Sequence, residues 1–590
     1  MSASNAQVKT ICPFCAIGCS LYLTFSNGVF RGIRPDFRSP VNEGCVCVKG
    51  MHAGEFINHQ DRIRFPLVRV GEKFFKISWN EAYHWIAQGF SSFTPSEIVV
   101  LGSGLCTNED NYVLSKFAKK VLGCNQKPKK QIIDPDSLNL VDYRDFTSRM
   151  SLSDITSASV IVSLYDNLCE EYPLIGRYII EAQERGAIFI SADVRLTLTG
   201  RVSDLFLEVY PMEKGELLRA LILGDTTVGS SAGISEELIQ KTSDIITLGK
   251  EKGQILVFGP RLDIPECHDF AFFSTFRECN THGFLDLSGI PSSNFRDSSS
   301  YHALYLMGGN PVALLPTTGS DKSNMHKKLK KFSFVVVQDL FLTETNKHAN
   351  VILPAASFAE KDGTFTNMEG RVQRIRAVPG SIDEMKPDWQ IVCELAQSMG
   401  YHDGFSFSSP EEVFDEIQRE VPLYQGISWE ETGKPGGAFI RQAGMKKKRT
   451  TKKNSALTSK ATFGQNTTYR SSKSGKKAFY SPNERYPLWL ATGPDIWHTL
   501  TRTRTSRSPS LFVENDGYVM IHVDDARERD IVSGDQVRVV SPFGHIVCLA
   551  RVVKEIKCGV TWMPSFLSKG ETSLLDGRYT AVWISRCEEK

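Results

Sequence analysis

The 590-residue chain has no run of about 18 apolar residues, which excludes a membrane-spanning helix of ordinary length. Its first residues lack a basic start followed by an apolar run and lack a twin arginine, so we expect no export signal and a cytoplasmic location. A charge excess is missing too, because 69 Lys and Arg face 67 Asp and Glu, for a formal net charge of +2. This balance argues against a general nucleic-acid or membrane-surface role.

Cysteine, in contrast, is plentiful, with 14 residues. We expect no structural disulfides, because the cytoplasm keeps thiols reduced. Isolated cysteines in apolar runs, such as Cys393 and Cys548, are typical of small buried hydrophobic residues. The cysteines in CPFCAIGC (12–19) and CVCVKG (45–50) are clustered and need a different explanation.

The clustered cysteines Cys12, Cys15, Cys19 and Cys47 have the spacing C-x2-C-x3-C-x27-C. Two residues between cysteines let a tight loop direct both sulfurs at one metal centre, and a distant fourth cysteine closes the site. Thiolates suit an iron–sulfur cluster or zinc. Zinc sites usually combine two short clips, so three bunched cysteines and one remote cysteine favour a [4Fe-4S] cluster. Cys45 is an alternative ligand, although we expect it to be a bystander.

The chain is too long for one hydrophobic core, so we expect three or four domains. Residues 158–193 read as strand, helix and strand, which predicts a parallel, doubly wound sheet. Residues 96–123 read as a buried strand, a glycine turn and an amphipathic helix. Further short apolar strands are expected at 302–309, 333–341 and 349–357.

The last third of the chain changes character twice. Residues 445–485 are basic, rich in Ser and Thr and poor in apolar residues, which predicts a flexible linker. A basic arm that docks on an acidic partner is the alternative. Short alternating strands follow in residues 486–590 and predict an all-β barrel. No internal repeat of solenoid length is present.

Several segments resemble the α subunit of formate dehydrogenases and other molybdopterin oxidoreductases. The resemblance implies a [4Fe-4S] domain (1–66), two α/β lobes (67–444) and a double-psi-like barrel (486–590) that binds a molybdopterin dinucleotide. It also implies that Lys49 lies between the cluster and the pterin. The segments that carry the resemblance are CVKGMHAGEFINHQDRIRFPLVR (47–69), CTNEDNYVLSKFAKKVLG (106–123), LYLMGGNPV (304–312) and the run 335–378.

The sequence departs from this family where a Cys or selenocysteine should bind the metal, near residues 132–134. Neither Cys nor His occurs there, and Asp134 or Asp136 is the remaining candidate oxygen ligand. The family's Gly-Ser-Asn turn is SLYDNL (163–168), and Tyr165 cannot give a pyrophosphate the close approach that glycine allows. Molybdopterin guanine dinucleotide is therefore a doubtful cofactor, while Lys361-Asp362-Gly363-Thr364 is retained and is expected to maintain the fold.

We therefore expect an iron–sulfur electron-transfer subunit of a multi-subunit oxidoreductase linked to NAD(P)H or ferredoxin, with a degenerate molybdenum site and doubtful catalysis of its own. Its partners would be flavin- and iron–sulfur-containing subunits. One alternative is an active formate dehydrogenase with unusual metal ligation, in which Arg144, Arg149 or His282 would hold the substrate carboxylate. The other is a scaffold without a redox role.

Overall fold

The computed structural model describes residues 5–124, 131–133, 140–142, 150–259, 265–275, 278–287, 301–314, 325–378, 385–440, 481–493, 496, 507–508, 510, 517–564 and 579–587. Most of the predicted linker 445–485 and Asp134, Asp136, Arg144 and Arg149 lie outside these residues. Within them, every helix is too short or too polar to cross a membrane.

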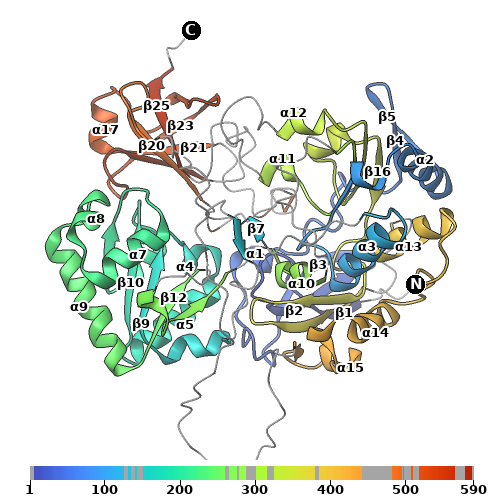
Figure 1. The fold of residues 1–590 in the computed structure, drawn as a ribbon, viewed down its shortest axis with the longest axis horizontal. Helices are drawn as coiled ribbons and strands as arrows, with labels where there is room; N and C mark the ends of the chain where they lie inside the picture. Colours follow the sequence, from blue (N-terminus) through green and yellow to red (C-terminus); the bar gives the residue numbers. More distant parts are fainter. Residues whose placement is uncertain are drawn as a thin grey trace, which may run out of the picture.

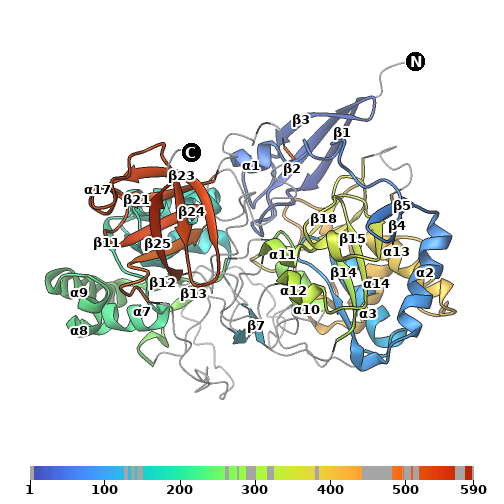
Figure 2. The same cartoon turned by 90° about the horizontal axis from the view of Figure 1, so that it is seen from above.

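The N-terminal domain is a small antiparallel sheet that lies against the second lobe, with α1 nearer the centre of the molecule (Figures 1 and 2). Its three strands occur in the order β1-β2-β3, and a short helix, α1, follows them. The elements are β1 (Asn5–Ile11), β2 (Ser20–Ser26), β3 (Val29–Pro35) and α1 (Val48–Met51).

The first lobe is a five-stranded, all-parallel sheet in the order β11-β10-β9-β12-β13, with helices packed on it. Its strands are continuous apolar runs, as expected for strands buried on both faces. The elements are β9 (Ala158–Leu164), α4 (Leu168–Glu171), α5 (Pro173–Glu184), β10 (Ile188–Asp193), α6 (Leu198–Val202), β11 (Leu205–Glu208), α7 (Lys214–Leu223), α8 (Thr226–Ser231), α9 (Glu236–Lys252), β12 (Gln254–Phe258) and β13 (Ala271–Phe273).

The second lobe combines residues from both sides of the first in the order β5-β4-β16-β15-β14-β6, and a smaller sheet, β17-β18-β19, packs beside it. Its elements are β4 (Leu67–Val70), β5 (Lys73–Lys76), α2 (Trp79–Ser91), β6 (Ile98–Leu101), α3 (Asn108–Lys120), α10 (Thr281–Leu287), β14 (Ala303–Met307), α11 (Pro311–Leu314), α12 (Met325–Leu329), β15 (Phe334–Asp339), β16 (Val351–Pro354), β17 (Gly363–Thr366), β18 (Arg371–Ile375), α13 (Asp388–Ser398), α14 (Pro410–Glu420), α15 (Trp429–Thr432) and β19 (Ala438–Phe439). The strands β7 (Gln131–Ile133) and β8 (Leu140–Asp142) pair separately.

The C-terminal domain is a closed barrel, β20-β24-β21-β23-β22-β25, that sits over the first lobe (Figure 1). Its elements are β20 (Leu488–Gly493), β21 (Tyr518–His522), α17 (Val523–Arg527), β22 (Gln536–Val540), β23 (His545–Val553), β24 (Val560–Pro564) and β25 (Tyr579–Arg586). The predicted fold class, an iron–sulfur domain with α/β lobes and a C-terminal barrel, is confirmed.

The two lobes repeat one arrangement of strands. In the first lobe β9 lies between β10 and β12, and in the second lobe β14 lies between β15 and β6 in the same way. The edges β11 and β16 also correspond, so β11-β10-β9-β12 matches β16-β15-β14-β6. All of these strands are parallel within their sheets, so the carboxyl ends of the matching strands lie at one edge of each sheet.

Candidate functional site

Strand pairing brings the first and third cysteines together. β1 ends at Ile11 opposite Ser20, the first residue of β2, so Cys12 and Cys19 flank the connection between the strands. The Cys12 N–H donates to the Cys19 carbonyl at 2.9 Å. Gly18 has φ of +80°, and a Cβ there would lie 2.2 Å from Gln373 Oε1, so this loop needs glycine.

The fourth cysteine arrives from the start of α1. Cys47 is the N-cap residue of this helix, and Gly50 lies one turn further on. A Cβ built on Gly50 would lie 3.7 Å from Cys12 Sγ and 3.9 Å from Cys47 Sγ. Both sulfurs therefore lie beside Gly50, where a Cβ would first collide with Val46 Cγ1 at 2.7 Å.

Burial and mutual repulsion make these thiols poor isolated anions. Burial and the neighbouring Cys15 and Cys47 raise the pKa of Cys12 well above its usual value, and burial with Cys15 and Cys12 does the same for Cys19. Burial and then Cys47 raise the pKa of Cys15 to about 11. A bound metal centre removes this penalty because it holds all four sulfurs as thiolates. The four cysteines therefore fit an iron–sulfur cluster.

The spacing of the sulfurs is wider than one zinc ion requires. Four thiolates at about 2.3 Å from a zinc ion lie within about 3.8 Å of one another. Among the residues that the structure describes, no three of the N-terminal thiols lie within 4.8 Å of one another. A cluster, whose irons separate the sulfurs, suits this spacing better.

Cys45, the alternative ligand, is directed elsewhere. It is exposed, and its sulfur accepts a hydrogen bond from Arg177 Nη1 at 3.4 Å. The same guanidinium forms an ion pair with Glu43 at 2.5 Å. This arrangement agrees with the expected role of a bystander at the surface.

Lys49 joins three parts of the molecule beneath the cysteines. Its side chain is buried, and its ammonium donates to the carbonyls of Glu170 at 2.9 Å and Ile496 at 3.3 Å. Its charge lowers the pKa of Cys15, against the larger effect of burial. Lys49 is thus a buried link between the cysteine domain and the interior, and its place between a cluster and a pterin stays a prediction.

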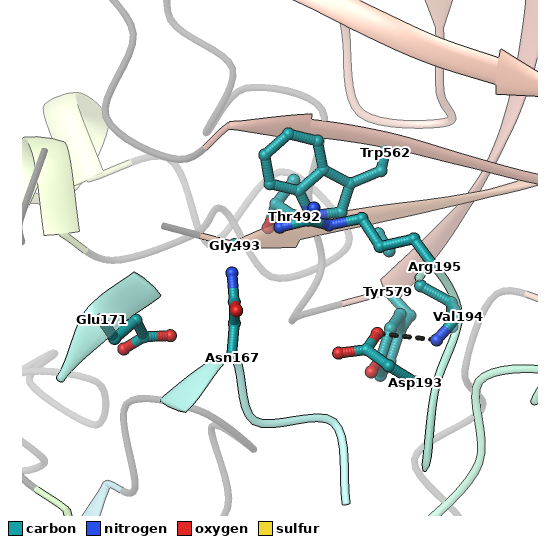
Figure 3. A pocket seen from close by; sticks show the side chains of 10 residues that line it. Asn167, Glu171, Asp193, Val194, Arg195, Thr492, Gly493, Trp562 and Tyr579 are labelled. Carbon is teal, nitrogen blue, oxygen red and sulfur yellow. Dashed lines mark hydrogen bonds between the residues drawn. The ribbon is translucent and has the colours of Figure 1, made fainter. Parts of the chain in front are cut away.

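A polar pocket opens at the carboxyl ends of β9 and β10, beneath the barrel (Figure 3). Its lining comes from the segments that follow β9 and β10 and from the barrel strands β20, β24 and β25. Arg195 stacks on Trp562 at 4.1 Å from the ring centroid. The lining residues are Asn167, Glu171, Asp193, Val194, Arg195, Ala491, Thr492, Gly493, Trp562 and Tyr579.

Tyr165 occupies the turn after β9 in a backbone conformation that favours glycine. Its φ is +58°, and its N–H donates to the Ala192 carbonyl at 2.7 Å. Its hydroxyl donates to the Tyr210 carbonyl at 2.8 Å and accepts from the Met212 N–H at 3.2 Å. Its ring lies edge-on to Tyr579 with centroids 5.9 Å apart. A phosphate cannot approach the backbone here as it could at glycine, so this turn does not fit a pyrophosphate.

The matching turn of the second lobe holds Gly308, with φ of +68°. Its N–H donates to the Gln338 carbonyl at 2.8 Å, just as Tyr165 donates to Ala192. A Cβ at Gly308 would lie 2.5 Å from Cys106 Sγ, so this position requires glycine. The close packing of Cys106 therefore imposes glycine here, whereas the first-lobe turn accepts tyrosine.

The strand after each turn ends in a matching aspartate. Asp193 Oδ1 accepts the Val194 N–H at 2.6 Å, and Asp339 Oδ1 accepts the Leu340 N–H at 2.6 Å. The two lobes therefore share the backbone hydrogen bonds around this turn and differ in its residue, Tyr165 or Gly308. Sequence reasoning missed Asn167, Glu171 and Trp562, because only the closure of the barrel over the lobe brings them together.

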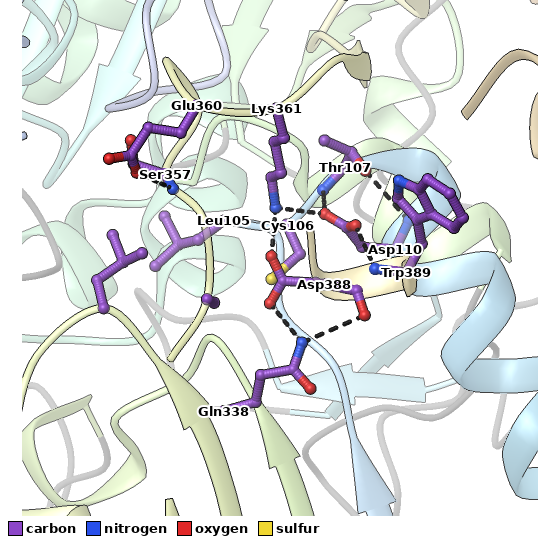
Figure 4. Close-up of polar contacts among 12 residues, drawn as sticks. Leu105, Cys106, Thr107, Asp110, Gln338, Ser357, Glu360, Lys361, Asp388 and Trp389 are labelled. Carbon is purple, nitrogen blue, oxygen red and sulfur yellow. Dashed lines mark hydrogen bonds and ion pairs between the residues drawn. The ribbon is translucent and has the colours of Figure 1, made fainter. Parts of the chain in front are cut away.

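The retained Lys361 belongs to a buried charge cluster in the second lobe (Figure 4). Its ammonium bonds Asp110 at 2.6 Å and also contacts Asp388, which accepts from Gln338 Nε2 at 2.7 Å. Burial lowers the pKa of Lys361, but the two carboxylates outweigh burial and raise it above the usual value. The cluster ties α3, β15 and α13 together, which supports the expected role in the fold.

His282, a candidate substrate cation, is buried in α10. Burial lowers its pKa to about 4, so it is neutral near pH 7. Its Nδ1 lies 3.4 Å from Asp286 Oδ2. A neutral, enclosed imidazole is poorly suited to hold a carboxylate substrate.

Three family descriptions match the chain. Residues 62–214 and 264–398 match the molybdopterin oxidoreductase family, residues 6–59 its Fe4S4 domain, and residues 488–577 the molydopterin dinucleotide binding domain.

Similar proteins span nearly the whole chain. The F420-dependent formate dehydrogenase subunit alpha of Methanocaldococcus jannaschii is 30% identical and covers 96% of both chains. The assimilatory nitrate reductase catalytic subunit of Bacillus subtilis is 27% identical, covering 95% of this chain and 92% of its own. The structure of acetylene hydratase from Pelobacter acetylenicus has a TM-score of 0.65 at 14% identity, covering 98% of this chain and 100% of its own.

Proposed function

Because the chain belongs to the molybdopterin oxidoreductase family, we propose that it is the iron–sulfur electron-transfer subunit of a multi-subunit, formate-dehydrogenase-like oxidoreductase. In this proposal Cys12, Cys15, Cys19 and Cys47 hold one [4Fe-4S] cluster, and the molybdenum site is degenerate. A bound cluster supplies one-electron transfer.

The observation that carries the proposal is the complete cysteine site with Lys49 behind it. Four thiols lie near one another, burial disfavours bare thiolates at Cys12, Cys15 and Cys19, and a buried ammonium lies nearby. A positive charge there stabilises the more negative, reduced state of a cluster. These residues suit reversible electron transfer.

Two features support the loss of a reactive metal centre. Residues 125–168 contain neither Cys nor His, so the segment where the family places its metal ligand offers no soft donor. In the first lobe, Tyr165 fills the turn where a pyrophosphate would need bare backbone. A subunit of this kind acts only when neighbours deliver and remove electrons. We therefore assign it flavin- and iron–sulfur-containing partners, linked to NAD(P)H or ferredoxin, in the cytoplasm.

A second candidate is an active molybdopterin-dependent formate dehydrogenase with an unusual metal ligand. It is favoured by the match of residues 488–577 to the dinucleotide binding domain.

Redox titration of the purified chain under electron paramagnetic resonance tests the proposal. We expect one reversible one-electron signal from the cluster, and no oxidation of formate with an artificial electron acceptor. Formate oxidation that tracks the amount of bound molybdenum or tungsten would support the second candidate. A chain without any reversible signal would overturn the redox role altogether.

A further inference from the structure

Three metal-binding side chains from two segments meet on the barrel. His522, Asp525 and Cys558 place a ring nitrogen, a carboxylate oxygen and a sulfur within 4.8 Å of one another. His522 caps α17, Asp525 lies in that helix, and Cys558 lies in the turn between β23 and β24. The Gly559 N–H donates to Asp525 Oδ2 at 2.7 Å, and the Cys558 thiol contacts Oδ1 at 3.7 Å. The helix and the turn are thus fixed against each other.

The surroundings of the thiol are acidic. Burial raises the pKa of Cys558, and the carboxylates of Asp525, Asp524 and Glu528 raise it further. The negative charge of these carboxylates disfavours a thiolate anion, and the same charge attracts a metal cation. Arg529 is the opposing charge, with Nη1 3.9 Å from Asp525 Oδ1 and engaged with the Asp525 carbonyl at 2.6 Å.

A comparable donor group in the second lobe shows the alternative. Cys106, Asp110 and Asp388 also lie within 4.8 Å of one another, but they are buried and Lys361 bonds both carboxylates (Figure 4). There the Lys361 ammonium occupies the place that a metal ion would need. At Asp525 the nearest guanidinium stands at 3.9 Å, and Cys558 is exposed.

We propose that His522, Asp525 and Cys558 bind a divalent cation of the zinc type. Nitrogen, oxygen and sulfur donors suit zinc, whereas magnesium and calcium prefer oxygen alone. Binding releases the Cys558 thiol proton to solvent, and water completes the coordination at the exposed side.

The ion would also fasten the barrel to the first lobe. The turn that carries Cys558 pairs with the strand end that lines the pocket. The Leu196 N–H donates to the Glu555 carbonyl at 2.8 Å, and the Lys557 N–H donates to the Val194 carbonyl at 2.9 Å. A bound ion holds this turn to α17 and so stabilises the contact with the pocket.

Zinc binding by the full, cluster-loaded chain tests the site. After equilibrium dialysis at fixed free zinc, we expect one zinc per chain with unchanged iron, both measured by elemental analysis. Cys558→Ser and His522→Gln should each weaken zinc binding at least roughly tenfold, because even the loss of an outer-shell partner costs that much. Cys587→Ser is the matched control, a cysteine of the same barrel outside the triad, and should bind zinc normally.

Hydrogen exchange gives the second readout. Zinc should slow exchange of the amides at 555–559 in the wild type and in Cys587→Ser, but not in Cys558→Ser. Equal zinc binding by all four chains would place the ion elsewhere and overturn the proposal. A wild-type chain that binds no zinc would overturn it as well.

Discussion

The turns after β9 and β14 occupy equivalent places in two lobes with the same strand order, yet one holds Tyr165 and the other Gly308. Both residues have positive φ, and both donate their N–H to the carbonyl before the next strand's aspartate. Tyrosine in this conformation costs about 1–2 kcal/mol. Its two hydroxyl hydrogen bonds and its buried ring offset that cost.

The difference shows how one backbone plan can hold a large side chain at one turn and exclude any side chain at the other. The backbone plan survives a change of side chain when the new side chain finds partners of its own. In the second lobe no side chain can do so, because Cys106 lies where a Cβ would point. Whether the turn accepts a side chain is therefore decided by the packing around one residue in each lobe.

Among the changes that test this comparison, Gly308→Ala is expected to lower the stability most. The Cβ would meet Cys106 Sγ at 2.5 Å and adopt a positive φ, so we expect a loss of about 3–4 kcal/mol in unfolding free energy, measured by thermal unfolding. Gly71→Ala is the matched control, since its φ is +63° with nothing within 4 Å, and should cost about 1–2 kcal/mol. Adding Cys106→Ala should recover part of the Gly308→Ala loss. Equal losses at both glycines would show that the collision is absent.

The second lobe also contains a buried acid, Glu109, whose effect on stability depends on pH. Burial raises the pKa of Glu109 from 4.5 to about 7, against hydrogen bonds from Thr364. Its contribution to stability is full below pH 4.5 and is lost as the pH rises to about 7, because the folded chain holds the proton more tightly. Glu109→Gln should flatten this dependence by up to about 3 kcal/mol in pH-dependent urea unfolding. The exposed Glu251→Gln is the control, and an unchanged profile in Glu109→Gln would contradict the assignment.

Tyr165→Phe tests how the first-lobe turn tolerates tyrosine. It keeps the ring and removes the hydroxyl, which leaves the Tyr210 carbonyl and the Met212 N–H without this partner. We expect a loss of about 1–3 kcal/mol in thermal unfolding. Tyr178→Phe, whose hydroxyl bond to the Val41 carbonyl is long at 3.5 Å, should cost less. If the two variants lose the same stability, the hydroxyl does not offset the strain.

Lys49→Ala gives the smallest effect and concerns the cluster. Removing the buried ammonium should make the cluster harder to reduce, on the order of tens of millivolts, in a redox titration. Lys250→Ala is a control, because that lysine lies in α9 of the first lobe and donates to the Glu266 carbonyl at 3.1 Å. An unchanged potential in Lys49→Ala would remove its role in tuning the cluster.

The parallel strands could be predicted because each is a local apolar run. The match to the Fe4S4 domain supports the cluster, and the assignment of its four cysteines stays a prediction, with Cys12 and Cys19 placed at one hairpin. The sequence could not predict that Arg195 stacks on Trp562 across two domains. This contact depends on tertiary packing between segments far apart in the chain.

The central claim is that the iron–sulfur entrance is retained while the reactive metal behind it is lost. Counting metals and pterin in the chain purified with its partners tests this claim most directly. The account predicts about four irons per chain, no stoichiometric molybdenum or tungsten, and no bound pterin. One molybdenum or tungsten per chain with its pterin would contradict it.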